Sequence, residues 1–121
     1  MIVAVPREIS AGERRVALVP DAVKLLKSKG VDVVVERGAG AAAGFDDAAY
    51  EAAGATLEAD ARALLSRADV VLKVQAPTER ADGSHEVDSL RAGSVLIGLL
   101  RPLDAPELAK RLAGAKVTAF A

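Results

Sequence analysis

Two cationic side chains, Arg15 and Lys73, are the clearest candidates for chemistry in this sequence of 121 residues. Arg15 lies in a long stretch between an apolar segment that ends at Pro6 and the first helical pattern, and long loops inside a compact domain are often functional. Lys73 interrupts the apolar run at residues 70–74. Together they could bind a small anion, because a guanidinium holds a carboxylate through two parallel hydrogen bonds.

Lys73 has two interpretations, because a lysine in a buried strand is unfavourable unless its ammonium finds water or a partner. The ammonium could reach water at the end of the sheet. It could instead contact an anion at the carboxyl edge, where open α/β sheets bind ligands. In the strand order predicted below, Lys73 and the loop that carries Arg15 face the same crevice.

The arginines at this edge could also have simpler roles than ligand binding, as partners of carboxylates within the chain. Arg14 and Arg15 are adjacent and should point in different directions, and one of them could pair with Glu13 or Glu8. Arg101 ends the fourth predicted strand at the same sheet edge. It could join the cationic group or only neutralise Asp104.

The glycine-rich segment at residues 38–44 follows an apolar run and invites comparison with a dinucleotide fingerprint. Its spacing, G-x-G-x-x-x-G, is one residue longer than the usual form, and Phe45 and Asp46 separate it from the next helix. No strand that ends in an acidic residue follows at the position of the ribose ligand. The segment is interpreted as a plain turn, so no cofactor-binding residue is assigned.

Other polar residues favour structural roles. His85 lies in a polar stretch and is expected to be solvated, with a general base as the minor alternative. Asp46 and Asp47 could suggest a metal or phosphoacceptor pair, but capping of a helix explains them better. The sequence has no cysteine and one histidine, so no metal site is predicted.

Five apolar runs of strand length alternate with helical segments, at residues 2–5, 31–35, 70–74, 95–100 and 117–120. Runs without polar alternation are typical of parallel strands covered on both faces. The pattern predicts an α/β fold: an open, mostly parallel, Rossmann-like sheet of about five strands in a flavodoxin-like 2-1-3-4-5 order, with helices on both faces.

Helices are predicted from Pro20 to Gly30, from a cap at Asp46 to Gly54, over residues 57–67, and from a cap at Asp104 to Gly114. Phe45 should pack on Tyr50 at the start of the second helix. A short helix is expected around residues 86–90, within the polar connection 75–93.

Composition narrows the class of function. Apolar residues make up 51% of the chain, which suffices for one core, and 16 basic against 17 acidic residues give no electrostatic reason to bind nucleic acid. Arg7 and Glu8 interrupt the first apolar run, so it does not resemble a signal peptide. The longest apolar run is far below the ~20 residues that span a bilayer. A cytoplasmic location is expected.

Several ordered blocks resemble one family over essentially the whole chain. The blocks are V-P-R-E, E-R-R-V-A-L-V-P, V-E-R-G-A-G, F-D-D-A-A-Y-E-A-A-G-A and V-L-K-V-Q-A-P. They are similar to the N-terminal domain shared by alanine dehydrogenases and the alpha subunit of proton-translocating NAD(P) transhydrogenase. The blocks at residues 45–47 and 72–77 look more like the transhydrogenase branch.

The resemblance implies an enzyme component that takes part in hydride transfer from NADH to NADP⁺. It implies that residues 1–121 form an N-terminal lobe, that a second, dinucleotide-binding domain follows and holds NAD(H), and that NADP(H) binds to a partner component. It also implies a homodimer on the cytoplasmic side, associated with the inner membrane through partner subunits. Because Ala121 ends a strand, we expect a longer protein, the alternative being an edge strand.

The resemblance gives Arg15 and Lys73 the positions that bind the substrate carboxylate and carbonyl in alanine dehydrogenases, and they are the candidate catalytic residues. Alanine dehydrogenases carry a histidine where this sequence has Arg101, so their chemistry is in doubt here. In a transhydrogenase the pair could be a relic. An alanine dehydrogenase-like oxidoreductase and a stand-alone α/β anion-binding module remain as alternatives.

Overall fold

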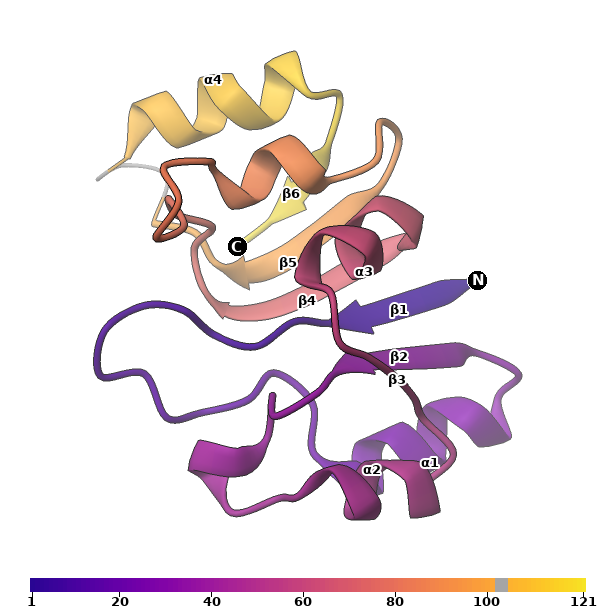
Figure 1. The fold of residues 1–121 in the computed structure, drawn as a ribbon. Helices are drawn as coiled ribbons and strands as arrows, with labels where there is room; N and C mark the ends of the chain where they lie inside the picture. The colour runs from indigo at the N-terminus through magenta and orange to yellow at the C-terminus, as the bar shows by residue number, and fades with distance from the viewer. Residues whose placement is uncertain (102–104) are drawn as a thin grey trace.

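The chain folds around one six-stranded parallel sheet with the strand order β3-β2-β1-β4-β5-β6 (Figure 1). The structure is a computed structural model that describes residues 1–101 and 105–121. The strands are β1 (Ile2–Val5), β2 (Asp32–Glu36), β3 (Thr56–Glu58), β4 (Val70–Gln75), β5 (Val95–Leu99) and β6 (Thr118–Phe120). The helices are α1 (Pro20–Ser28), α2 (Asp47–Ala52), α3 (Ala61–Arg67) and α4 (Pro106–Gly114), with 3₁₀ turns η1 (Ala41–Ala43) and η2 (Glu86–Ser89).

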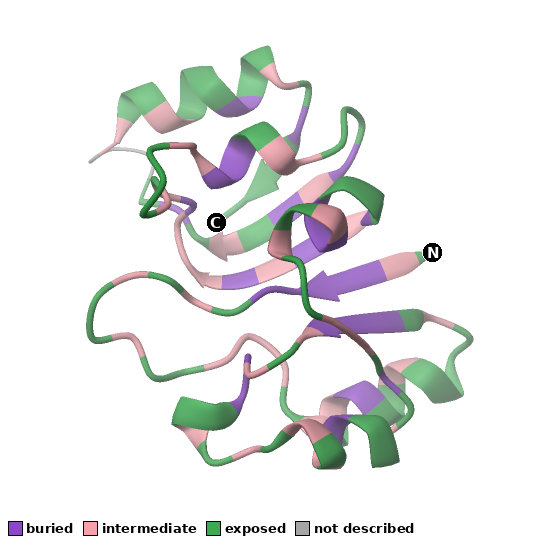
Figure 2. Cartoon of the chain, in the orientation of Figure 1, coloured by how far each residue is buried: buried purple, intermediate pink, exposed green. Residues whose placement is uncertain are grey.

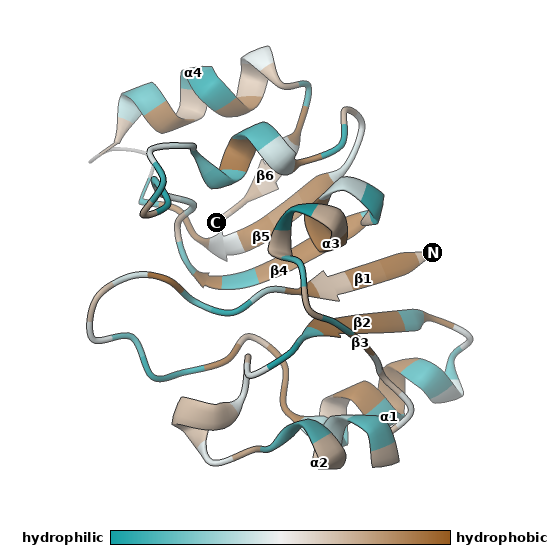
Figure 3. Ribbon diagram, in the orientation of Figure 1, coloured by the Kyte–Doolittle hydropathy of each residue, from teal (hydrophilic) through white to brown (hydrophobic). Residues whose placement is uncertain are grey.

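Helices cover both faces of the sheet, as predicted. On one face α3, η2 and α4 pack on the sheet, with Leu64, Val87 and Leu112 in one apolar cluster. On the other face α1 and α2 contribute Val23 and Tyr50 to a second cluster. The central strands are therefore buried between two helical layers (Figure 2) and form the most apolar part of the ribbon (Figure 3).

The five predicted strands occur in the predicted order, but a sixth strand was missed. Thr56–Glu58 forms β3 and pairs in parallel with β2, at residues where the sequence pattern predicted the start of the third helix. That helix begins only at Ala61, because the Asp60 side chain accepts a hydrogen bond from Arg62 N at 3.0 Å and caps it. With β3 added, the order becomes the Rossmann order, 3-2-1-4-5-6.

The expectation that every strand is covered on both faces is wrong for the last two strands. Ile97, Leu99 and Phe120 are exposed, and Ile97 lies beside Phe120 in the register of β5 and β6. By contrast, Val33, Val34 and Val35 on β2 are all buried, and they alternate between the two apolar clusters. Apolar runs without polar alternation therefore predicted the parallel strands correctly. They did not predict which strands the helices cover.

Local signals set most helix ends. Asp46 caps α2 by accepting a hydrogen bond from Ala49 N at 2.9 Å, as predicted, and Phe45 packs against the cluster that contains Tyr50. Proline at the first position begins α1 and α4. The predicted cap Asp104 lies outside the described residues. Within residues 1–101 and 105–121, no helix is both long and apolar enough to cross a membrane.

Candidate functional site

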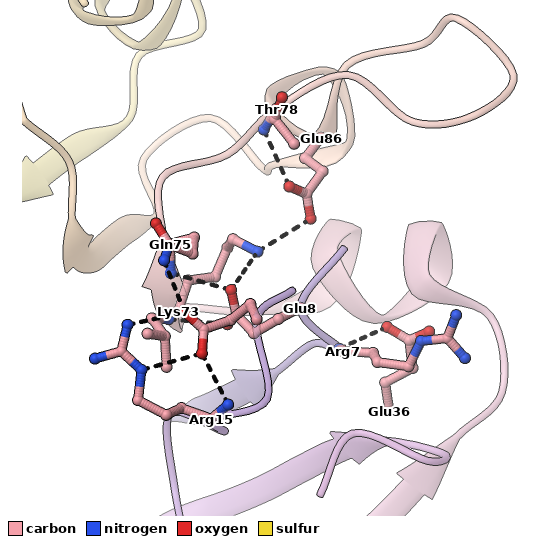
Figure 4. Close-up of polar contacts among 10 residues, drawn as sticks. Arg7, Glu8, Arg15, Glu36, Lys73, Gln75, Thr78 and Glu86 are labelled. Atoms are coloured by element: carbon pink, nitrogen blue, oxygen red, sulfur yellow. Dashed lines mark hydrogen bonds and ion pairs between the residues drawn. The ribbon is translucent and has the colours of Figure 1, made fainter. Parts of the chain in front are cut away.

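Arg15, labelled in Figure 4, is held at the carboxyl edge of the sheet by the carboxylate of Glu13. Arg15 Nε and Nη2 donate to the two Glu13 oxygens at 3.0 and 2.8 Å, which is the two-point geometry expected of an arginine and a carboxylate. Arg15 N also donates to Glu13 at 2.8 Å, and Gln75 Nε2 at the end of β4 donates at 2.7 Å. The Glu13 side chain is 6% exposed and that of Arg15 is 63% exposed. Arg15 is thus positioned but remains open to solvent.

This arrangement sets the charge state of Glu13. Hydrogen bonds from the Arg15 side chain and backbone and from Gln75 hold the pKa of the Glu13 carboxyl well below its usual range. The same contact raises the pKa of Arg15. The pair is therefore ionised across the range in which an enzyme works.

Lys73 lies between two other carboxylates. Its Nζ is 3.3 Å from Glu8 Oε1 and 3.3 Å from Glu86 Oε2. The side chains of Lys73, Glu8 and Glu86 are 2%, 3% and 5% exposed, so the three charges form a buried triad. Two carboxylates compensate the desolvation of one ammonium, which is how a buried charge is tolerated.

The triad also fastens the long loop after β1 to the end of β4. The Glu8 carboxylate accepts hydrogen bonds from Val74 N at 2.8 Å and from Gln75 N at 3.0 Å, where the pairing of β4 with β5 shifts register. Glu86 accepts from Thr78 N at 3.1 Å and so ties the loop after β4 to the same ammonium. The Lys73 ammonium thus joins the loop after β1, through Glu8, to the loop after β4, through Glu86.

The structure brings the two predicted site residues together. Arg15 and Lys73 line one groove of about 480 Å³, with Leu72, Ile97 and Leu99 as its apolar wall. Both residues line this groove, as predicted, but the Lys73 ammonium is held by Glu8 and Glu86, which do not line it. The alternative in which the Lys73 ammonium reaches water is wrong, because Glu8 and Glu86 enclose it. Their catalytic role stays a prediction.

The remaining cations of this edge are less constrained. Arg15, rather than the exposed Arg14, takes the predicted pairing with Glu13. Arg101 is exposed just after β5 and has a φ of 46°, in the left-handed region. Asp104, its predicted alternative partner, lies outside the described residues, so both interpretations of Arg101 stay predictions.

The glycine-rich segment is built to hold Tyr50. A Cβ at Gly40 would lie 2.6 Å from Tyr50 Cε2 and 2.8 Å from Phe45 O, so only glycine fits there. The Tyr50 hydroxyl donates to Leu18 O at 2.8 Å and so links this turn to the loop of Arg15. Gly38 N donates to Asp47 Oδ1 at 2.9 Å, Ala39 N donates to Glu36 O at 3.0 Å, and the N–H groups of residues 41, 43, 44 and 45 donate to carbonyls of the same segment. These groups are already used within the chain, which supports the interpretation as a turn. The expectation that no strand with a terminal acidic residue follows this segment is wrong, because β3 ends in Glu58.

His85 and the aspartate pair have structural roles. His85 Nδ1 accepts a hydrogen bond from Val87 N at 3.1 Å and begins η2, and Asp88 completes a capping box. Burial lowers the pKa of His85. Asp46 caps α2 and Asp47 holds Gly38. In the part of the chain that the structure describes, no three His, Asp or Glu side chains are grouped closely enough to hold a metal ion.

Neither partner of Lys73 was predicted from the sequence. Water and an external anion were the two candidates for the ammonium, and Glu8 was a candidate partner only for an arginine. A signal existed, since a lysine in a buried strand requires nearby carboxylates. Which of the 17 acidic residues would serve depended on how two distant loops fold back onto β4.

Comparison with known proteins adds independent information. The sequence profile of the family described as "Alanine dehydrogenase/PNT, N-terminal domain" matches residues 4–121. An NAD(P) transhydrogenase subunit alpha of Rhodospirillum rubrum is 43% identical over 121 residues, and the alanine dehydrogenase of Bacillus subtilis is also 43% identical over 121 residues. Each alignment covers 100% of this chain but only 32% and 30% of the two relatives.

Solved structures give the same two groups. The transhydrogenase of Sinorhizobium meliloti superposes with a TM-score of 0.89 at 40% identity, covering 100% of this chain and 34% of that one. An L-alanine dehydrogenase superposes with a TM-score of 0.91 at 36% identity, covering 100% and 32%. The chain thus spans about one third of the length of these relatives.

Proposed function

Because the chain belongs to the alanine dehydrogenase/PNT N-terminal domain family, we propose that it is the first lobe of an NAD(P) transhydrogenase alpha subunit. The complete enzyme would transfer hydride from NADH to NADP⁺. A dinucleotide-binding domain would follow this lobe and hold NAD(H), while NADP(H) binds to a partner component. The lobe would supply one wall of the site or the scaffold of a dimer.

Overall identity does not separate the two branches, because one relative from each is 43% identical. The observation that supports the transhydrogenase branch is the enclosure of Lys73. Its ammonium is bound by Glu8 and Glu86 and is 2% exposed, so a keto acid could reach it only after the triad opens. In a transhydrogenase no keto acid is bound, and the triad can serve as a structural tie.

Alanine dehydrogenase-like chemistry is the second candidate, and it is favoured by Arg15. Its guanidinium is exposed and shares a groove with Lys73, which suits capture of a carboxylate. Against this candidate, Arg101 replaces the histidine that the family resemblance places there in alanine dehydrogenases. A stand-alone α/β module that binds a small anion in this groove is the third candidate.

The glycine-rich segment does not fit the pyrophosphate of a dinucleotide. Most of its N–H groups serve bonds within the chain, Tyr50 occupies the space beside Gly40, and the segment contains a 3₁₀ turn, η1, in place of the helix start that binds pyrophosphate. This supports the proposal that NAD(H) binds outside residues 1–121, and no step of hydride transfer is derived from this segment.

The same proposal includes the assembly. The lobe would lie on the cytoplasmic side, as part of a homodimer of alpha subunits that associates with the inner membrane through partner subunits and couples hydride transfer to proton translocation. Its near balance of charge, 16 basic and 17 acidic residues, fits contacts with proteins rather than with nucleic acid or an anionic membrane surface.

Two chimeras test the proposal. In one, this chain replaces the aligned 121 residues of the Rhodospirillum rubrum transhydrogenase subunit, and in the other those of the Bacillus subtilis alanine dehydrogenase. We expect the first to retain hydride transfer from NADH to NADP⁺ when combined with its partner components. We expect the second to fold but to lose alanine oxidation, because Arg101 stands at the histidine position.

The opposite pattern, alanine oxidation in the second chimera without transhydrogenation in the first, would establish the alanine dehydrogenase candidate. Arg101→His in the second chimera is the matched control, because it places a histidine at the position that alanine dehydrogenases use. Loss of both activities in folded chimeras would favour the stand-alone module.

A further inference from the structure

His85 is the only histidine in the chain, and its ring begins the short 3₁₀ turn η2. The ring nitrogen Nδ1 accepts a hydrogen bond from Val87 N at 3.1 Å, and the Asp88 carboxylate accepts one from His85 N at 3.3 Å. A side chain that caps in this way must be an acceptor. An imidazole accepts a hydrogen bond only while it is neutral, because both ring nitrogens are donors in the imidazolium ion. The start of η2 therefore depends on the charge of His85.

The same turn carries Glu86 into the buried triad. Glu86 Oε2 is 3.3 Å from Lys73 Nζ and Oε1 accepts a hydrogen bond from Thr78 N at 3.1 Å, two contacts that Figure 4 shows. Glu86 N donates to Thr78 O at 3.0 Å. Val87, which donates to the His85 ring, is buried in the apolar cluster between η2 and the sheet. The cap is thus one residue away from a carboxylate that encloses the Lys73 ammonium.

Charged groups from three elements of the described chain face His85. They are two carboxylates of η2, one of the loop after β4, and one carboxylate and one guanidinium of α4: Asp88, Glu86, Glu79, Glu107 and Arg111. Arg111 Nη1 donates to Asp88 Oδ1 at 3.2 Å, so its positive charge is fixed close to the ring.

Burial of the ring and the charge of Arg111 lower the pKa of His85, and the carboxylates of residues 79, 86 and 88 offset this only in part. The neutral ring, which is the form that can cap η2, is therefore the form that the fold favours. Its contribution to stability is present above the usual histidine pKa of about 6.5 and is lost as the pH falls through the lower folded-state pKa.

We propose that His85 is a proton-sensitive switch that controls how firmly Glu86 is held against Lys73. A proton on Nδ1 places a donor against the Val87 N–H, which breaks the cap and loosens η2 together with Glu86. The Lys73 ammonium then keeps Glu8 but loses the fixed position of its second carboxylate. Acid thereby weakens the enclosure of Lys73 on the side of the loop after β4. The switch goes beyond the proposed function, because it acts whether or not the complete protein transfers hydride.

A pH titration tests the switch, and the single histidine makes its ring signals unambiguous. The full chain, labelled with ¹³C and ¹⁵N, is studied by NMR from about pH 8 to about pH 4.5. We expect the ring to titrate below about 6.5, and the amide signals of Thr78, Glu86 and Val87 to shift with the same midpoint. Below that midpoint, hydrogen exchange of the Thr78 and Glu86 amides, corrected for the intrinsic rate at each pH, should be at least about threefold faster, as loss of a cap implies.

His85→Asn is the matched control, because an asparagine side chain accepts a hydrogen bond from Val87 N at every pH. It should lack both the amide shifts at that midpoint and the faster exchange. Shifts that persist in His85→Asn would assign them to the carboxylates and overturn the proposal. A ring that titrates while the amides of Thr78, Glu86 and Val87 stay unchanged would overturn it as well.

Arg111→Gln gives a second test, which decides if His85→Asn does not fold. Removal of the guanidinium should raise the midpoint of the His85 ring, because a positive charge that disfavours protonation is lost. The midpoint of the amide shifts at Thr78 and Glu86 should rise by the same amount. Amide shifts that keep their midpoint while that of the ring moves would contradict the switch.

Discussion

The loop after β1 and the end of β2 lie at the same sheet edge, yet their glutamates are in opposite situations. Glu13 in the loop accepts hydrogen bonds from Arg15 and Gln75, and its pKa is held well below the usual range. Glu36 at the end of β2 accepts one from Arg7 N, and burial raises its pKa. Glu13 is thus neutralised by a neighbouring arginine, whereas no ion pair within 4.0 Å to Glu36 is formed among the described residues.

This difference changes where a ligand should be sought. The sequence predicts an anion site at Arg15 and Lys73. In the structure Glu13 already binds Arg15, and Glu8 and Glu86 already bind Lys73. Among the described residues near the end of β2, Arg7, Glu36, Glu79 and Arg80 form no ion pair within 4.0 Å. The glycine-rich segment after β2 is a third case, in which a motif that resembles a phosphate-binding turn serves to pack Tyr50.

The largest effect is expected from Lys73→Met, which leaves two carboxylates buried without their cation. We expect the free energy of unfolding in urea to fall by about 3–5 kcal/mol. Lys110→Met on the exposed surface of α4 is the matched control and should change it by less than about 0.5 kcal/mol. Equal, small effects of the two substitutions would show that the triad does not stabilise the loop after β1.

Gly40→Ala tests the packing role of the glycine-rich segment. The added Cβ would lie 2.6 Å from Tyr50 Cε2, so the free energy of unfolding should fall by about 1–3 kcal/mol. Gly114→Ala at the end of α4 meets no atom within 4 Å and should be neutral or stabilising by up to about 1 kcal/mol. If Gly40→Ala were as stable as the wild type, the turn would have room for a ligand.

The two glutamates should give opposite dependences of stability on pH. The pKa of Glu13 is lowered in the folded state, so its stabilisation is present above about pH 4.5 and is lost as the pH falls toward the folded-state value. Glu13→Gln should therefore be less stable than the wild type at neutral pH, with a difference that shrinks in acid.

The pKa of Glu36 is raised, so its favourable contribution is present below about pH 4.5 and is lost as the pH rises through the folded-state value. Glu36→Gln should thus gain stability relative to the wild type as the pH rises, with no such gain in acid. Urea unfolding between about pH 3 and pH 8 measures both differences. The same sign for the two substitutions would contradict the comparison.

The sequence predicted what local signals encode. Valine-rich runs located five strands, Asp46 and Pro20 located helix starts, and the switch of connections between β1 and β4 placed Arg15 and Lys73 at one crevice. It did not predict features that depend on strand pairing or packing between residues far apart in the sequence. Leu57 fits a helical stripe but pairs with β2, Lys73 finds Glu8 and Glu86 through two folded loops, and Gly40 is required by a tyrosine ten residues away.

The central claim is that this lobe has no place for a dinucleotide in its glycine-rich segment and that its own carboxylates neutralise Arg15 and Lys73. Titration of the full chain with NADH, monitored by isothermal titration calorimetry, tests it most directly. We predict no saturable binding at micromolar concentrations of NADH. Micromolar affinity that is lost when Gly38 or Gly44 is changed to alanine would contradict the account.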